Sequence, residues 1–208
     1  MNDCTSRYQA TDERRRAIAA AARSLIVEKG FEGLRTRDIA DRVGINIATL
    51  HYHVPSKEAL IELVAQSLRD DFIAMSDSHA RAGQTPIQRL AREFEEVRET
   101  RKSHPELLLV MEELATRARR DEKIARYINP LQIRWRDDFT SIFRDGVDDG
   151  SFRDDLDCGA AADLVIGAII TSRMFGRDED AALMALYDEL LRSFLPPSRT
   201  PDHDHQVP

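Results

Sequence analysis

The sequence of 208 residues predicts an all-α protein, and three observations lead to this prediction. Apolar residues recur at helical spacing along most of the chain, and clusters of glycine and proline separate the stretches. Alternation of apolar and polar residues, which indicates strands, does not extend over a useful length. Residues 36–53 form a helix–glycine–helix pattern. The sequence therefore predicts an N-terminal three-helix domain with a helix-turn-helix, followed by a helical bundle.

The first predicted helix covers residues 11–30. Acidic residues occupy its first turn, and Lys29 with Gly30 marks its end. Its apolar stripe consists of Ile18, Ala21, Ala22, Leu25 and Ile26. A stripe of this kind is expected to pack against the helices that follow.

A tight turn at Gly44 separates the next two predicted helices. The first begins at Thr36, whose side-chain oxygen is placed to cap the orphan N–H groups. Gly44 tolerates the left-handed backbone that ends a helix, and Ile45 after it is expected to fill the angle between the two helices. Sharp turns of this kind bring two short helices into contact.

Asn46 is predicted to cap the second short helix, which runs from Ile47 to about His53. Leu50 is its one apolar anchor, and its other side chains are small or hydrogen-bonding, which suits a groove of DNA. The same pattern also fits an ordinary helical hairpin, so both interpretations stay open at this point.

The segment Val54–Glu58 ends the second short helix and begins a longer one at Ser56, which continues towards residue 80. Lys57 stands in the first turn of this long helix. Helix N–H dipoles and an ammonium group together favour a phosphate at that position.

Three further helices are predicted over residues 86–103, 105–119 and 122–147. The second of them is apolar nearly all round its first turns, which predicts a central, buried helix. Pro130 is expected to kink the third.

The last two predicted helices, residues 157–175 and 178–195, carry wide apolar stripes with small residues that allow close approach. A wide stripe needs two neighbours, so we expect these helices to form a homodimer interface with a second copy of themselves. Packing of both faces within one chain is the alternative.

Residues from about 14 to 63 resemble the DNA-binding domain of the tetracycline-repressor (TetR) family. The matching motifs are Lys29-Gly30-Phe31, Thr36-Arg-Asp-Ile-Ala40, Gly44-Ile-Asn46, Leu50-His-Tyr-His-Val54 and Ser56-Lys-Glu-Ala-Leu60. They cover about a quarter of the chain, and the remainder is similar to the family in helical character and length. The resemblance implies a regulatory and dimerisation domain after the DNA-binding head.

The resemblance also implies which residues bind DNA. Phosphate contacts are expected from Thr36, Tyr52 and Lys57. Base or backbone contacts are expected from Arg37, Asn46, Ile47, Ala48 and Thr49. The chain departs from the family by having His51 in place of a tyrosine and Val54 in place of a phenylalanine. If the His51 imidazole faces a phosphate, its protonation would strengthen DNA binding as the pH falls. His53 is a second DNA-site residue that could titrate. If His51 is neutral instead, it would only fill space against the backbone.

Charge and composition restrict the function classes. The net charge is −7, but residues 1–60 hold 10 basic and 8 acidic residues, or +2, and residues 61–208 hold 20 and 29, or −9. A mildly basic head on an acidic body fits DNA binding through a few placed contacts. The arginine triplet Arg14–Arg16 could belong to the DNA-binding surface of the head. Alternatively, it forms a solvated helix face whose charges pair with neighbouring acidic residues.

Neither membrane spans, catalysis nor metal binding is predicted. No apolar run approaches the length of a membrane span, and the N-terminus lacks a signal-peptide pattern. Glycine-rich phosphate loops, metal-spaced clusters and nucleophile motifs are missing, so no cofactor, metal or enzymatic activity is expected. Cys4 and Cys158 form no disulfide framework and fit reduced thiols in a cytoplasm. His203 and His205 lie in a tail that supplies no fixed metal geometry.

Seven residues are candidates for a small-molecule pocket, because polar groups accompany buried stripes there. They are Phe94, Met111, Glu112, Arg134, Trp135, Arg173 and Met174. Ordinary core packing and flanking ion pairs explain each of them better when it is taken singly.

The expected domains are a disordered arm over residues 1–10, the DNA-binding domain over 11–55, the regulatory domain over 56–195 and a disordered tail over 196–208. The expected function is a homodimeric regulator, a repressor that a small-molecule inducer releases from a pseudo-palindromic double-stranded DNA operator. Alternatives are a ligand-independent or protein-responsive regulator, a helical interaction protein with the same head, and an α-helical enzyme.

Overall fold

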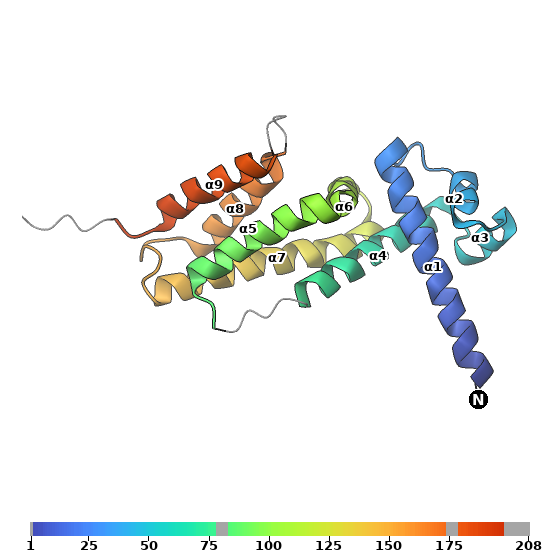
Figure 1. Cartoon of the computed structure of the whole chain (residues 1–208), viewed down its shortest axis with the longest axis horizontal. Coiled ribbons are helices and arrows are strands. Elements are labelled where there is room, and N and C mark those ends of the chain that lie inside the picture. The colour runs from blue at the N-terminus through green and yellow to red at the C-terminus, as the bar shows by residue number, and fades with distance from the viewer. Residues whose placement is uncertain (1, 78–82, 174–178, 198–208) are drawn as a thin grey trace, which may run out of the picture. The chain divides into compact units, whose positions relative to one another are not determined.

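The computed structural model describes the backbone of residues 2–77, 83–173 and 179–197, and the side chains of these residues from 11 to 75, 83 to 173 and 180 to 197. All regular structure in these ranges is helical, which confirms the all-α prediction (Figure 1). The helices are α1 (Asn2–Lys29), α2 (Thr36–Val43), α3 (Ile47–His53), α4 (Lys57–Asp77), α5 (Pro86–Ser103), α6 (Pro105–Ala118), α7 (Glu122–Asp148), α8 (Cys158–Thr171) and α9 (Glu179–Phe194).

The chain divides into two compact units. The first comprises residues 1–80 and 99–134, and the second comprises residues 81–98 and 135–208. This division differs from the boundary predicted between residues 55 and 56. The physical reason is that α4 and α6 both pack against α1, so the start of the predicted regulatory domain shares the core of the head.

The core of the first unit is built on the stripe of α1. Ile18, Ala22 and Leu25 are each at most 1% exposed, and they lie one helical turn apart on one face of α1. Ile39 of α2 and Leu50 of α3 join the same cluster of buried side chains. Burial of this stripe places α2 and α3 beside α1.

Helix α1 is longer than predicted, because its backbone is helical from Asn2. The prediction of a disordered arm over residues 1–10 is therefore wrong for this backbone. Helix nucleation is costly but propagation is not, so a helix fixed by its buried stripe extends readily towards the N-terminus. The tail predicted to be disordered lies outside the described residues from 198 onward.

Helix α6 is amphipathic rather than buried all round. Leu107, Val110 and Leu114 are buried, whereas Leu109 is 37% exposed and Glu113 is exposed. The prediction of a central helix is thus wrong. The buried face of α6 packs against α1 and α4, and the helical spacing places Leu109 off that face.

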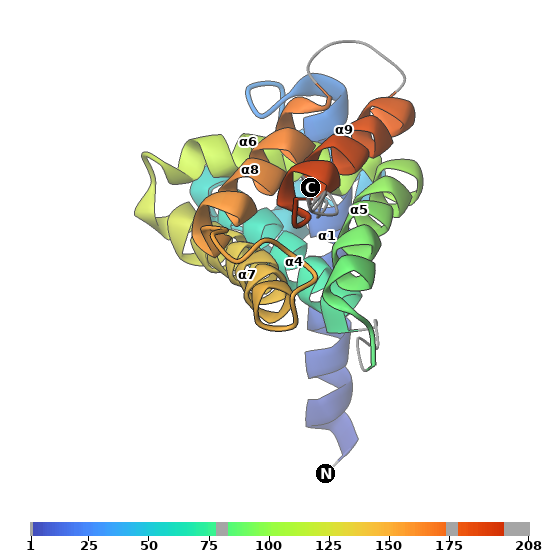
Figure 2. The ribbon, with the colours of Figure 1, turned by 90° about the vertical axis from the view of Figure 1, so that its left-hand side faces the viewer.

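The second unit has an aromatic core. Phe143 lies 5.4 Å from Phe152 and 4.9 Å from Phe194 between ring centroids, and all three rings are buried. Gly146 permits this packing, because a Cβ there would meet the Phe152 ring at 2.1 Å. Helices α8 and α9 lie side by side in this unit (Figure 2).

The described part of the chain shows neither a candidate membrane span nor a candidate metal site. None of its helices combines the length and the apolar character that a bilayer span requires. Its histidine, cysteine and acidic side chains form no group of three or more that would hold a metal ion.

Candidate nucleic-acid interface

Helix α2 starts one residue after its cap, at Thr36. The N-cap is Arg35, with φ −119° and ψ 137°, and no side chain bonds to the free N–H groups there. The predicted capping role of Thr36 is therefore wrong. Thr36 already has helical geometry, and a cap must lie in the extended residue that precedes the helix.

The turn between α2 and α3 has the predicted geometry. Gly44 adopts φ 72° and ψ 37°, and its N–H donates to the carbonyl groups that end α2. The N–H of Ile45 donates to the carbonyl of Ala40 at 2.9 Å, and the half-buried Ile45 packs against the core of the first unit. A side chain at residue 44 would strain this left-handed backbone.

Helix α3 is fixed on one face and open on the other. The Asn46 side chain accepts a hydrogen bond from the N–H of Thr49 at 2.7 Å, which confirms the predicted cap. Leu50 is 0% exposed, and Val54 after the helix is 2% exposed. The opposite face carries Tyr52, which is 83% exposed, and other solvent-facing side chains.

The C-terminus of α3 is held by α1. The Arg15 guanidinium donates to the carbonyl of His53, the last residue of α3, at 3.0 Å. A cation at a helix C-terminus satisfies an orphan carbonyl and complements the helix dipole. The three arginines therefore differ in role. Arg15 positions α3, whereas Arg14 and Arg16 are exposed. The sequence alone does not indicate that Arg15 binds the end of α3, because Arg15 and His53 are 38 residues apart.

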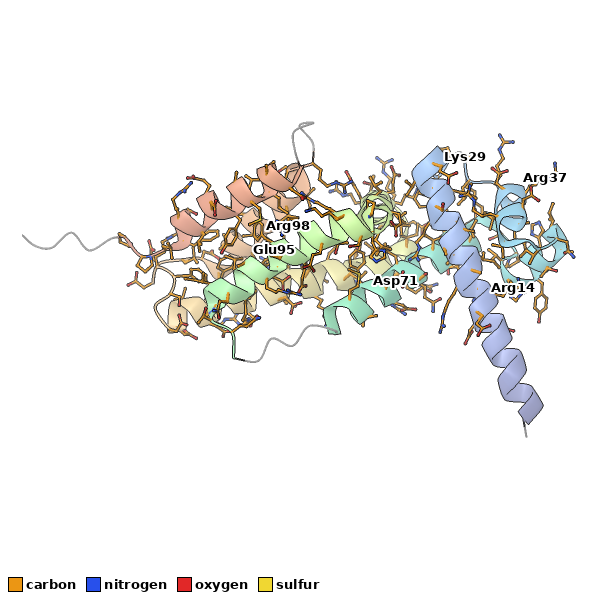
Figure 3. All side chains as sticks on the ribbon, in the orientation of Figure 1. Arg14, Lys29, Arg37, Asp71, Glu95 and Arg98 are labelled. Carbon is orange, nitrogen blue, oxygen red and sulfur yellow. The ribbon has the colours of Figure 1, made fainter. Side chains whose placement is uncertain are left out.

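The predicted DNA-contact residues lie at the start of α2, on α3 with its cap Asn46, and at the start of α4. Arg37, Ile47, Ala48 and His51 are exposed, as is Lys57. Thr36, Thr49 and His53 are half-buried. Arg37 and Arg14 lie at the surface of the head and have no ion pair among the described residues (Figure 3). Ser56 caps α4, because its side-chain oxygen accepts from the N–H of Ala59 at 3.1 Å.

Acidic neighbours pair with other basic groups of the head. Lys29 donates to Asp38 at 2.6 Å and thereby lowers the pKa of that carboxyl group. The Arg42 guanidinium donates to both carboxylate oxygens of Glu28, at 2.8 and 2.9 Å. These hydrogen bonds lower the pKa of Glu28. Few cations thus remain for phosphates, which agrees with the small positive charge of the head.

The predicted ligand residues are distributed over both units. Met111 packs against the core of the first unit, where Glu112 and Arg134 are exposed. In the second unit, Phe94 is fully buried, with its ring 5.1 Å from that of Tyr187.

Two other predicted ligand residues of the second unit are accessible to solvent. Trp135 is half-buried, with its ring 5.6 Å from that of Phe139, and Arg173 is half-buried. Met174 lies outside the described residues.

Two surface hollows border α1, and neither is lined by a predicted ligand residue. One, of about 260 Å³, lies between α1 and α4 and has mostly charged or polar walls. The ion pair between Arg23 of α1 and Asp71 of α4 spans the same two helices. The other hollow, of about 360 Å³, is lined by α1 residues and Glu106. Sequence patterns cannot indicate such hollows, because they depend on how separate helices meet.

The arrangement of α2, Gly44 and α3 defines a helix-turn-helix DNA-binding regulator. The profile described as "Bacterial regulatory proteins, tetR family" matches residues 18–64. The repressor KstR2 of Mycobacterium tuberculosis is 25% identical over 146 residues, which is 70% of this chain and 72% of that protein. Over residues 18–64 this chain is therefore similar to the TetR family of bacterial regulatory proteins.

Solved structures share the fold over most of the chain. A Saccharomonospora viridis protein described as a transcriptional regulator, in complex with choline, has a TM-score of 0.78 and 26% identity, with 89% of this chain and all of that chain covered. AibR in complex with isovaleryl coenzyme A and operator DNA has a TM-score of 0.69 and 21% identity, with 88% and 99% covered.

We predict that His53 makes the head less stable in acid. Burial lowers the pKa of His53, and the charges of Arg15 and Arg14 lower it further. The unfolded chain therefore takes up the proton first. The stability contributed by neutral His53 is complete above about pH 6.5 and is lost as the pH falls through the lower folded pKa. In urea titrations between about pH 7.5 and 5, His53→Gln should lose less unfolding free energy than wild type.

His51→Gln is the matched control, because it removes an exposed imidazole from the same helix. It should follow the wild-type pH dependence of unfolding. Equal pH dependence in wild type and His53→Gln would contradict the assignment to His53.

Proposed function

We propose that this regulator is a repressor that binds a pseudo-palindromic operator as a homodimer and is released by a small molecule. The observation that carries the proposal is the two-sided character of α3. Leu50 fixes one face in the core, while the face with Tyr52 stays in solvent. A recognition helix needs this combination, because its outer face must enter the major groove without disturbing the fold.

The proposed contacts have distinct roles. Tyr52 and Lys57 bind phosphates, and Thr36 adds a further phosphate contact from α2. Thr49 and the residues at the start of α3 contact base edges. The side-chain oxygen of Asn46 accepts from the N–H of Thr49, and its amide NH₂ group is the part that we assign to DNA. His51, which precedes Tyr52, is also exposed and is proposed to face the DNA.

Helix α8 offers a surface for the second copy. Leu164 and Ile170 are 59% and 54% exposed, although they are large and apolar. Gly167 lies between them with open space around its Cα. Exposed apolar groups beside a glycine allow close helix approach, so we assign the homodimer contact to α8 and its neighbour α9. Two heads would then sit roughly 34–36 Å apart, one turn of DNA.

The inducer is proposed to bind the second unit. The solved structures of the Saccharomonospora viridis protein and of AibR contain choline and isovaleryl coenzyme A, respectively. Phe94, Trp135 and Arg173 are the pocket candidates of that unit. For a hundredfold loss of operator affinity, the inducer must favour the DNA-incompetent state by about 2.7 kcal/mol. Its action on an operator would place the protein in the bacterial cytoplasm.

We predict that selection from random-sequence duplexes enriches an inverted repeat. A ligand-independent regulator would give the same repeat with no inducer response, whereas a helical interaction protein or an enzyme would give none. About 6–8 phosphates neutralised per dimer imply a log–log salt slope near −5 to −7 on the enriched duplex. Lys57→Ala should flatten the slope and weaken all sequences alike, whereas Thr49→Ala should change the selected sequence.

The roles of these two residues would be reversed if Lys57→Ala altered the selected sequence and left the salt slope unchanged. Failure to enrich any repeat would contradict DNA recognition by α3 altogether. Fluorescence anisotropy measures the slopes, and sequencing of the selected pools measures the preference.

We predict that Leu164→Glu disrupts the dimer. Light scattering should give twice the 23.7 kDa chain mass for wild type and a single chain mass for the variant, because a buried unpaired carboxylate is costly. Ile133→Glu is the matched control, since Ile133 is also 59% exposed but lies on α7. A dimeric Leu164→Glu protein together with a monomeric Ile133→Glu protein would move the interface to α7.

A further inference from the structure

Glu32, in the connection between α1 and α2, lies between two cations from other helices. Its carboxylate accepts a hydrogen bond from Arg117 of α6 at 2.9 Å. Its second oxygen lies 4.0 Å from the ammonium nitrogen of Lys57, in the first turn of α4. Glu32 therefore links the end of α6 to a residue that we assign to DNA phosphate.

Arg117 is the better fixed of the two cations. Its guanidinium carbon lies 4.4 Å from the ring centroid of Phe31, and that ring is only 2% exposed. The Arg117 side chain is 32% exposed, against 46% for Lys57. A guanidinium that stacks on a buried ring and donates to a carboxylate loses less freedom than a lysine at the limit of ion-pair distance.

The two cations compete for one negative charge. Arg117 and Lys57 both lower the pKa of Glu32, and the hydrogen bond from Arg117 is the largest cause. While Arg117 holds the carboxylate, Lys57 is held only loosely. If Arg117 were lost, the Glu32 side chain, which is 86% exposed, would be free to close on Lys57.

We propose that Arg117 is a positioning residue for DNA binding, which keeps Lys57 available to phosphate by occupying Glu32. The inference rests on the proposed function, because it assumes that Lys57 contacts DNA. It assigns no DNA contact to Arg117 itself, so the effect of Arg117 on DNA must pass through Glu32 and Lys57.

The test measures salt slopes and affinities on the enriched duplex. Arg117→Gln should flatten the slope by as much as Lys57→Ala does, and it should weaken binding by about threefold per head, or roughly tenfold per dimer. Adding Glu32→Gln to Arg117→Gln should restore both quantities. Combining Arg117→Gln with Lys57→Ala should give no flattening beyond that of Lys57→Ala alone.

Two further variants separate this role from simpler ones. Arg119→Gln removes an equal charge from the end of α6, where Arg119 is exposed, and should keep the wild-type slope. Arg117→Met keeps an unbranched side chain against Phe31, so it replaces Arg117→Gln if circular dichroism shows that the glutamine variant does not fold.

Each remaining outcome is decisive. Weakening by Arg117→Gln that persists with Glu32→Gln would overturn the inference, as would equal weakening by Arg119→Gln. An unchanged slope in Lys57→Ala, on a duplex that still binds specifically, would overturn both the inference and the phosphate role of Lys57. Absence of any enriched duplex would instead contradict the proposed function, and with it the inference.

Discussion

The orientation of α3 depends on the burial of one side chain, Leu50. A seven-residue helix is too short to be stable alone, so tertiary packing must maintain it. Leu50 and Val54 supply that packing against the core built on α1. Both anchors lie on the inner side of α3, so the packing of this helix does not depend on the side chains of its outer face. The side chains that we propose to contact DNA are therefore not needed to anchor the helix.

The two ends of α3 reinforce this anchor in different ways. Asn46 caps the first turn from within the local sequence, while Arg15 reaches the last carbonyl from α1. The side-chain oxygen of Asn46 therefore serves the helix cap. Burial and the nearby arginines also favour neutral His53. Residues that we propose as DNA contacts thus also take part in the structure at both ends of this short helix.

Several features set by nearby residues were predictable from the sequence, although the cap of α2 was not. Gly44 and Asn46 determine their own turn and cap through backbone preference, and proline or glycine breaks gave helix bounds within a few residues. Features set by distant partners were not predictable. The contact of Arg15 with His53 and the exposure of Leu109 both depend on which helices meet. The pocket candidates stay predictions for the same reason, because a pocket depends on packing among helices.

The most direct test of the account is a crystal structure of the dimer on the enriched duplex. In that structure, the face of α3 with Tyr52 should lie in the major groove, and Leu50 should stay in the core of the head. Lys57 should lie within hydrogen-bond distance of a phosphate. Duplex bound along another surface, with α3 facing solvent, would contradict the account.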